Sequence, residues 1–211
     1  MSETASAPTA GIVVGDDNLA RCAWAHSTPE YRAYHDTEWG FPVADDRRLF
    51  EKLCLEGFQA GLSWLTILRK REAFREVFAG FDYETVAGYG PGHVSDLMDD
   101  ARIVRNRAKI EAVINNAQRA VELVAQEGSL AGLVWSYEPS EPRTAPTAGQ
   151  VPAATPESKA LARELKRRGW RFTGPTTVYA FMQAMGLVND HLAGCHVRAV
   201  VEAARHEFKR P

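Results

Sequence analysis

Hydrophobic residues recur at helical spacing over most of this chain, and the alternation typical of strands is nearly absent. After Asp45 and Asp46, which stand where helix caps are expected, apolar side chains follow at spacings of three and four on one broad face. That face carries Leu49, Phe50, Leu53, Cys54 and Ala60. The same spacing predicts further helices over 65–78, 92–99, 108–126, 158–168, 177–185 and 197–208. The pattern therefore predicts an all-α fold.

Two stretches interrupt the helical pattern. Residues 1–19 are small and polar apart from Ile12 to Val14, and we expect them to form a flexible tail. Residues 138–157 are rich in proline, which excludes a helix or a central strand and predicts a long surface loop. The prolines in this segment are Pro139, Pro142, Pro146, Pro152 and Pro156. In a chain of 211 residues, the span 20–208 is then expected to be a single domain.

Composition limits the class of protein. Hydrophobic residues make up 45% and charged residues 25%, which excludes a disordered chain, a collagen-like fibre and a disulfide-dependent mini-protein. The net charge of −2 excludes a uniformly basic surface, although a local basic patch would fit. An odd number of cysteines, three, favours the reduced cytosol over a disulfide framework. Since the start resembles no signal peptide and no apolar run approaches the roughly 18 residues of a membrane span, we expect a cytoplasmic protein.

Two pairs of cysteine and histidine residues lie at opposite ends of the chain. Cys22 and His35 are near the start, while His191 and Cys195 are near the end, at a spacing that shares one face if the segment is helical. Two thiolates and two imidazoles suit tetrahedral zinc, and four protein ligands would make the ion structural. The alternative is two unrelated pairs, with Cys195 a small buried side chain. Neighbouring histidines that could replace a ligand are His26 and His196.

Glu56 continues the apolar stripe that starts at Leu49, so its carboxylate is expected to point into the core. Burial of a charge costs roughly several kcal/mol of stability unless the charge is paired or hydrogen-bonded. A buried and partnered carboxylate is a candidate for a functional site. The alternative is that Glu56 emerges at the rim of the stripe and contacts an arginine.

Aromatic residues gather in the same part of the chain. They are Trp24, Tyr31, Tyr34, Trp39 and Trp64. An aromatic cage beside a carboxylate suits a flat, electron-poor or cationic heterocycle, through stacking, cation–π attraction and a hydrogen bond to a ring edge. The alternative is that these tryptophans are ordinary core residues, although the polar surroundings of Tyr34 and Trp39 argue against it.

A basic segment lies between two predicted helices. Residues 101–110 contain four cations and no acidic residue. A short turn between helices can offer backbone N–H groups and cations to a phosphate, although helix surfaces often carry such runs. A second basic group, at 166–171, is most simply a solvated helix end. Combined with an aromatic pocket and a carboxylate, the first segment favours an enzyme that holds a nucleic-acid backbone and inspects one base.

Several long strings then occur in a characteristic order between Arg21 and Cys195. They are CAW, YHDTEWG, FEKLCLEGFQAGLSWLTILRKRE, AKIEAVINNA and TTVYAFMQAMGLVNDHLAGC. In these strings the chain resembles the 3-methyladenine DNA glycosylase I family. The resemblance implies an all-helical member of the helix-hairpin-helix DNA glycosylase superfamily, with one structural zinc ion joining the N- and C-terminal segments.

The resemblance also implies a role for individual residues. It places the zinc ligands on Cys22, His35, His191 and Cys195, and the catalytic glutamate of the base pocket on Glu56. The aromatic residues implied around the base are Trp24, Tyr31, Tyr34, Trp39 and Trp64. The residues implied to contact DNA are Gly61 and Leu62, in a turn that wedges into the duplex, and Arg102, Ile103, Arg105, Arg107 and Lys109 in the hairpin.

This chain departs from the family at two hairpin positions. Arg102 stands where the family commonly has glycine, and Ala108 stands where a relative can have glycine. A helical or extended backbone would tolerate Arg102 and add a cation. Other superfamily members also carry an aspartate just after the hairpin, whereas the only carboxylate in that segment here is Glu111, which we interpret as a solvated helix residue.

The activity implied by the resemblance is hydrolysis of the N-glycosidic bond of 3-methyladenine in alkylated duplex DNA. The product would be an abasic site, with no lyase step. Because N3-methylation makes the base cationic, the base leaves as a neutral molecule and needs little acid catalysis. The enzyme would flip the nucleotide into the aromatic pocket, where Glu56 accepts a hydrogen bond from the base.

We accordingly expect duplex DNA with alkylated bases as the partner, and neither a membrane nor a nucleotide cofactor. The protein is expected to be a monomer that associates with the nucleoid when it acts on DNA. One alternative is a non-catalytic, zinc-stabilised protein that binds damaged DNA. Another is a zinc hydrolase, against which the full set of four protein ligands argues.

Overall fold

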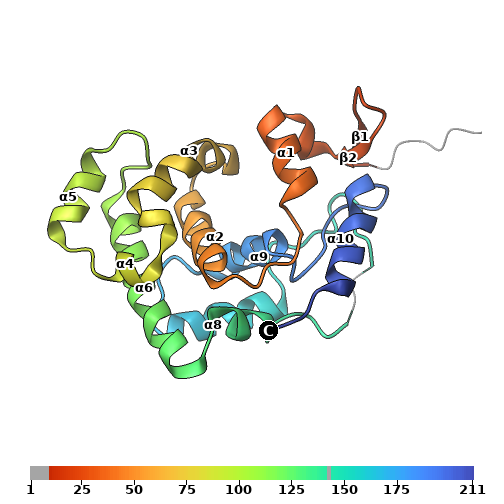
Figure 1. Ribbon diagram of the computed structural model, residues 1–211. Coiled ribbons are helices and arrows are strands. Elements are labelled where there is room, and N and C mark those ends of the chain that lie inside the picture. Colours follow the sequence, from red (N-terminus) through yellow and green to blue (C-terminus); the bar gives the residue numbers. More distant parts are fainter. Residues whose placement is uncertain (1–9, 142–143) are drawn as a thin grey trace, which may run out of the picture.

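Helices dominate the computed structural model, which describes residues 10–141 and 144–211 (Figure 1). The helices are α1 (Pro29–Thr37), α2 (Asp46–Gln59), α3 (Trp64–Val77), α4 (Tyr83–Ala87), α5 (Pro91–Asp99), α6 (Arg107–Glu127), α7 (Leu130–Trp135), α8 (Pro156–Arg167), α9 (Pro175–Ala184) and α10 (His196–Glu207). Two short strands, β1 (Ile12–Val14) and β2 (Ala20–Cys22), and two 3₁₀ turns, η1 (Ala23–His26) and η2 (Ala79–Phe81), complete the elements. The prediction of a helical fold is confirmed, although β1 and β2 depart from the all-α fold that was predicted. Within the described part, no helix is both long and apolar enough to cross a membrane.

Local capping explains where the helices begin. The Asp45 carboxylate accepts the backbone N–H of Arg48 at 2.8 Å, which confirms the predicted start of α2. Helices α3, α5, α6, α8, α9 and α10 also begin and end within two residues of the predicted ranges. Helix α1 was not predicted, since its sequence, PEYRAYHDT, is largely polar. Helices α4 and α7, with five and six residues, are too short to show a period.

The segment predicted as a tail contains a β-hairpin. Strand β1 pairs antiparallel with β2, with Ile12 opposite Cys22 and Val14 opposite Ala20. Arg21 is buried beneath the hairpin and forms ion pairs with Asp17 at 2.7 Å and Asp36 at 2.8 Å. These ion pairs hold the turn against α1, so the prediction of a tail is wrong for residues 10–19. Residues 1–9 lie outside the described part of the chain.

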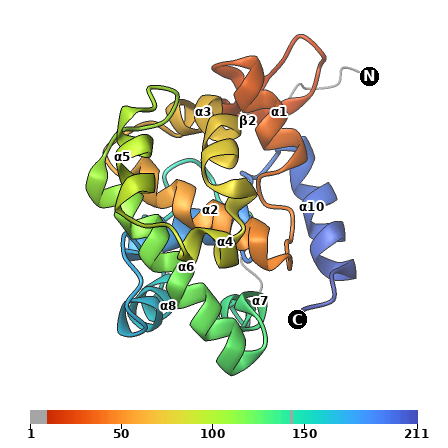
Figure 2. The ribbon, with the colours of Figure 1, turned by 60° about the vertical axis from the view of Figure 1, so that its left-hand side comes forward.

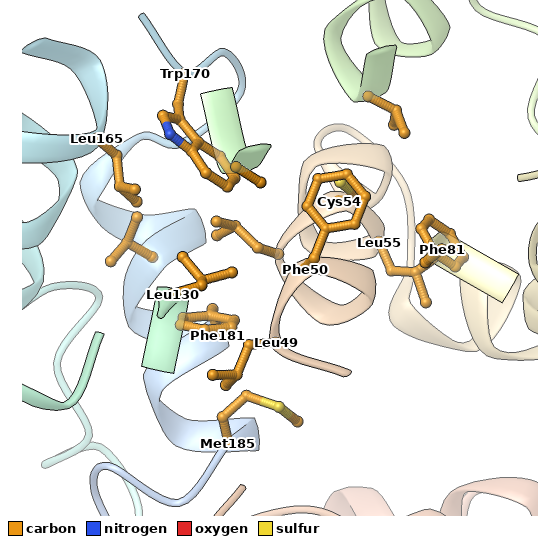
Figure 3. Packing of buried hydrophobic residues seen from close by; sticks show 14 of the residues in the cluster. Leu49, Phe50, Cys54, Leu55, Phe81, Leu130, Leu165, Trp170, Phe181 and Met185 are labelled. Carbon is orange, nitrogen blue, oxygen red and sulfur yellow. The ribbon is translucent and has the colours of Figure 1, made fainter. Parts of the chain in front are cut away.

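The core surrounds α2. Its residues 49, 50 and 52–58 are all buried, so this helix has hardly any solvent-facing side along its second half. Figure 3 shows Leu49 and Phe50 of α2 packed beside Phe181 of α9 and Leu130 of α7. A second, smaller hydrophobic cluster consists of Cys22, Leu192, Cys195, Val197 and Val201. Figures 1 and 2 place α1, the strands and α10 on one side of the molecule and α4 to α6 on the other, with α2 and α9 between them.

The proline-rich segment was predicted to be a loop over 138–157. Its described residues 138–141 and 144–155 contain no helix or strand, whereas Pro156 and Glu157 already belong to α8. The loop packs against the second cluster: the Pro146 carbonyl accepts the N–H of Ala193 at 2.8 Å, and Val151 contacts both hydrophobic clusters. Thr155, at its end, is buried and caps α8. The loop therefore covers the region where the two ends of the chain meet.

Asp46 joins the start of α2 to the start of α7, 84 residues further along the chain. Its two carboxylate oxygens accept the N–H groups of Leu130 at 3.0 Å and Ala131 at 2.7 Å. Asp46→Ala leaves both N–H groups without an acceptor, and we expect it to lower the free energy of unfolding by about 2 kcal/mol. Urea unfolding followed by circular dichroism measures this loss. The matched change Asp99→Ala, at an exposed position, should stay within about 0.5 kcal/mol, and equal effects of the two would contradict the capping role.

Candidate functional site

A cavity of about 210 Å³ lies between α1, α2, α3 and α9. Its lining residues are Trp24, Tyr31, Tyr34, Trp39, Glu56, Gln59, Trp64, Ala180 and Gln183. All five aromatic residues predicted for a binding pocket, and the predicted glutamate, thus line one cavity. Gln59, Ala180 and Gln183 were not predicted, because a glutamine or an alanine in a helix carries no signal of its own.

The aromatic walls are built from edge-on contacts. The Trp24 ring centroid lies 5.5 Å from that of Tyr31 and 5.2 Å from that of Trp39, with planes at 84° and 82°. Such T-shaped pairs are favourable, since the positive ring edge meets the negative face. The Tyr31 hydroxyl also accepts the backbone N–H of Leu65 at 2.8 Å. This bond fixes α1 to the start of α3, so the two sides of the cavity are held together.

Glu56 lies inside this aromatic cavity, with only 5% of its surface exposed. The expectation that its carboxylate points inward is confirmed, and the alternative of an arginine contact at the rim is wrong. Its partner is Lys52, one helical turn earlier, whose Nζ lies 2.6 Å from Glu56 Oε1. The Lys52 ammonium also donates to the Tyr34 hydroxyl at 2.9 Å and lies 3.2 Å from the centroid of the Trp64 ring. The sequence signal for this pair was the i,i+4 spacing of a lysine and a glutamate on a buried face.

Burial shifts the protonation equilibria of the residues around Glu56. Desolvation lowers the pKa of Lys52, and the opposing charge of Glu56 offsets part of that effect. Desolvation, together with the Glu56 charge, raises the pKa of Tyr34 well above its usual value, so its hydroxyl stays neutral. Behind Lys52, Arg71 forms a two-pronged ion pair with Glu38 at 2.6 and 3.0 Å. The nearest additional charges are therefore already neutralised.

A second cluster of functional groups lies where the two ends of the chain meet. Cys22, at the end of β2, His35, in α1, and Cys195, just before α10, are all buried, and their ligand atoms lie within 4.8 Å of one another. Cys195 Sγ is 3.5 Å from His35 Nε2. These three residues could hold a metal ion. The segment from His191 to Cys195 is a loop and not a helix. His191 and Cys195 therefore do not lie on one face of a helix, which was the arrangement expected if this segment were helical.

His191 is the remaining residue predicted for the metal site. Its ring lies 4.8 Å from the His35 ring, and its Nε2 is buried without a hydrogen-bond partner. Its Nδ1 is 2.9 Å from Asn189 Oδ1, just as His35 Nδ1 is 2.7 Å from Asp36 Oδ1, an arrangement typical of metal-ligating histidines. Burial lowers the pKa of His191 to about 4, which keeps the imidazole in the neutral form that binds metals.

Of the two histidines that could have replaced a ligand, His26 is engaged elsewhere, since its Nε2 contacts the Val13 carbonyl at 3.0 Å. His196 Nε2 lies 3.6 Å from Asp36 Oδ1 and, like His191 Nε2, is buried without a hydrogen-bond partner. The contact of the His191 ring with the His35 ring favours His191 as the fourth donor beside Cys22, His35 and Cys195.

Helices α5 and α6 form a hairpin through residues 100–106. Lys70 of α3 donates to the carbonyls of Ala101 at 3.2 Å and Arg102 at 2.8 Å, which anchors this turn. Neither Arg102 nor Ala108 has a positive φ, so the departures from glycine cause no backbone strain. The Arg102 guanidinium pairs with Asp100 and Glu76. Arg105 and Arg107 are exposed, and their contacts with DNA stay predictions.

The side chains of two hairpin residues that were predicted to contact DNA face the interior of the protein. The Ile103 side chain is 3% exposed and belongs to the core, so a contact of this residue with DNA stays a prediction for its backbone alone. The Lys109 ammonium is also directed inward, where it donates to the carbonyls of Phe58 at 2.8 Å and Ala60 at 2.6 Å. It therefore stabilises the end of α2 and is not available to a phosphate.

The turn after α2 leaves a hydrophobic side chain in solvent. Gly61 has a φ of +79°, a conformation that glycine adopts without strain. Leu62, next to it, is 42% exposed. The turn lies between Gln59 and Trp64, two residues that line the aromatic cavity. A duplex that places a base in this cavity would meet Leu62 beside it.

The role of Lys109 can be tested against its exposed neighbour Arg105. Lys109→Met removes both hydrogen bonds to the end of α2, and we expect it to lower the free energy of unfolding by about 2 kcal/mol. Arg105→Met should leave stability within about 0.5 kcal/mol. Chemical denaturation of both variants measures their free energies of unfolding. A Lys109→Met protein as stable as wild type would show that its ammonium is not structural.

Comparison with known proteins agrees with this geometry. A family model described as methyladenine glycosylase matches residues 24–199. The chain is 46% identical to DNA-3-methyladenine glycosylase 1 of Escherichia coli (strain K12) over 179 residues, which are 84% of this chain and 96% of that protein. A crystal structure of 3-methyladenine DNA glycosylase I matches with a TM-score of 0.80 at 47% identity, covering 83% of this chain and 98% of its own. A structure of the Staphylococcus aureus enzyme that addresses 3-methyladenine recognition matches with a TM-score of 0.80 at 38% identity, covering 84% and 96%. The sequence match over most of both chains and the shared fold show that this chain belongs to the methyladenine glycosylase family.

Proposed function

We propose that the protein is a DNA-3-methyladenine glycosylase I, which hydrolyses the N-glycosidic bond of 3-methyladenine in alkylated duplex DNA and leaves an abasic site. The observation that carries the proposal is the cavity in which Glu56 lies among five aromatic side chains. The activity named for the relatives from Escherichia coli and Staphylococcus aureus supports the same substrate.

The chemistry follows from the charge of the substrate. Methylation at N3 gives the base a positive charge, so the glycosidic bond breaks with the base leaving as a neutral molecule. The aromatic rings of Trp24, Tyr34 and Trp64 favour a flat cation through stacking and cation–π attraction. Glu56 accepts a hydrogen bond from the amino group or ring edge of the base. Water adds to C1′ of the sugar as the base leaves, so no adduct between a lysine and the sugar is needed, and the reaction is monofunctional.

The base must leave the duplex to reach this cavity, and the proposed DNA surface surrounds its entrance. Leu62, on the exposed turn, enters the gap left by the flipped nucleotide. The α5–α6 hairpin acts as the helix-hairpin-helix element and contacts phosphates through backbone N–H groups with Arg105 and Arg107. Glu111 is half exposed and lies 3.6 Å from Arg107, so it serves as a surface ion-pair residue.

We also propose that Cys22, His35, His191 and Cys195 bind one structural zinc ion. Two thiolates and two imidazoles match the preference of zinc, and the contact between the rings of His191 and His35, together with the unpartnered Nε2 of His191, supports the fourth position. The ion supplies no chemistry to the reaction, because four protein ligands fill its coordination. It joins β2 and α1 to the segment before α10.

Glu56→Gln tests the catalytic role. We expect the variant to fold but to lose at least about 99% of its release of 3-methyladenine, because an amide carries no charge and binds the cationic base poorly. Chromatography of free bases from methylated duplex DNA measures the release. Glu111→Gln, a change at the exposed carboxylate, should keep wild-type activity.

A folded Glu56→Gln protein with near-native release would contradict the role of Glu56. If the wild-type protein releases no base but still binds damaged DNA, the non-catalytic alternative replaces the proposed activity.

Cys195→Ser tests the metal site, with Cys54→Ser as a matched control at another buried cysteine. We expect Cys195→Ser to lose most of its bound zinc and to unfold about 10 °C lower than wild type, because metal binding contributes directly to folding. Cys54→Ser should keep its zinc, since Cys54 lies in the main core. Metal analysis and thermal unfolding provide the two readouts. Full zinc content in Cys195→Ser would show that the ligand set is wrong.

A further inference from the structure

Lys52 is a buried cation beside the candidate base pocket, where it contacts three of the residues that line the pocket, and the proposed reaction assigns it no role. It is 6% exposed, and its ammonium contacts Glu56, Tyr34 and Trp64 at once. A buried lysine costs stability unless its charge is paired. Burial of the Lys52 ammonium therefore costs desolvation free energy, at a position where an apolar side chain would pack without that cost.

The contact with Lys52 gives the two carboxylate oxygens of Glu56 different surroundings. Oε1 lies 2.6 Å from the Lys52 ammonium. No donor from the described residues is recorded for Oε2, and the Glu56 side chain lines the cavity. A carboxylate held at one oxygen keeps the other oriented and available to a hydrogen-bond donor in the cavity.

Neighbouring charges do not replace Lys52. From α1, the side chains that face the cavity include the phenols of Tyr31 and Tyr34, and Glu38, the residue after α1, is paired with Arg71 of α3. Arg75 of α3 is paired with Glu51 of α2 at 2.7 Å. From α9, the cavity receives Ala180 and Gln183, which carry no charge. In the part of the chain that the structure describes, Lys52 is the only cation recorded within ion-pair distance of Glu56.

The loss of this counter-charge would change the state of Glu56. A carboxylate surrounded by aromatic rings is poorly solvated, and such an environment favours the protonated form. A protonated Glu56 would carry no charge to attract a cationic base, and one of its oxygens would become a donor. Arg71 and Arg75 are held by other carboxylates, so neither is free to take the place of Lys52.

We propose that Lys52 is a positioning residue of the base pocket, which keeps Glu56 ionised through one oxygen and presents the other oxygen to the base. The inference rests on the proposed glycosylase function. It assigns to Lys52 no contact with the substrate, and its effect is exerted through Glu56.

Three substitutions separate charge from hydrogen bonding. Lys52→Met removes both, Lys52→Gln keeps a donor without charge, and Lys52→Arg keeps the charge. A crevice of about 40 Å³ next to Lys52 gives room for the larger guanidinium. Lys159→Met, at an exposed position in α8, is the matched control.

The experiment measures kcat/KM for release of 3-methyladenine from methylated duplex DNA between pH 5 and 9, roughly the range in which most proteins stay folded. We expect the acidic limb of the profile to move up by about one pH unit or more in Lys52→Met and Lys52→Gln, because Glu56 takes up a proton more readily. At a pH on that limb, the rate should fall about tenfold or more. Lys52→Arg and Lys159→Met should keep the wild-type limb. Binding of free 3-methyladenine, followed by tryptophan fluorescence, should show the same shift without turnover.

A folded Lys52→Met or Lys52→Gln protein with the wild-type acidic limb would overturn the inference. If Lys52→Met does not fold, Lys52→Gln decides. A uniform loss of rate at every pH, with no shift of the limb, would show that Lys52 is only structural. If the wild-type protein itself releases no 3-methyladenine, the proposed function fails and the inference fails with it.

Discussion

Burial of the second half of α2 is the constraint on which the site depends. A helix with one apolar stripe could carry a glutamate on its free face at little cost, but the second half of α2 has no free face. Both Lys52 and Glu56 must then lie inside the protein, where each charge is stable only beside the other. Because they are one turn apart on a single helix, the pair forms with the helix itself and needs no distant partner. The same burial places the carboxylate against the cavity, where a bound base can reach it.

The opposite wall of the cavity depends on the group of cysteine and histidine residues where the two ends of the chain meet. Trp24, Tyr34 and Trp39 belong to the segment that contains Cys22 and His35, and the Trp39 ring lies 4.6 Å from the ring of His191. The aromatic wall is therefore positioned by the same residues that could hold a metal ion. Arg198 of α10 donates to the carbonyls of Asn189 and His191, which fixes the loop carrying the last donors.

The sequence was sufficient for features that depend on local pattern or on residue chemistry. The periodic helices, the inward direction of Glu56 and the group of cysteines and histidines all follow from spacing and residue type. Helix α1 was missed because its inward side consists of Tyr34 and His35, which a hydrophobic pattern does not count as core. The partner of Glu56 was missed because a lysine is normally assigned to the surface. Lys109 was misassigned because its ammonium is held by the carbonyls of Phe58 and Ala60, 51 and 49 positions away in the sequence. The burial of the Ile103 side chain in the core was also missed.

The hairpin shows why a basic stretch does not translate directly into a DNA surface. Lys109 is bound to backbone carbonyls, and Arg102 is held by Asp100 and Glu76, so only part of the positive charge in this segment faces solvent freely. An arginine that must leave a carboxylate before it contacts a phosphate contributes less to affinity than a free one, because one ion pair is exchanged for another. Few free cations give a small release of counterions. Affinity for a damaged site would then come mainly from the exposed Leu62 and from the base held in the cavity, both of which require a nucleotide that leaves the stack readily.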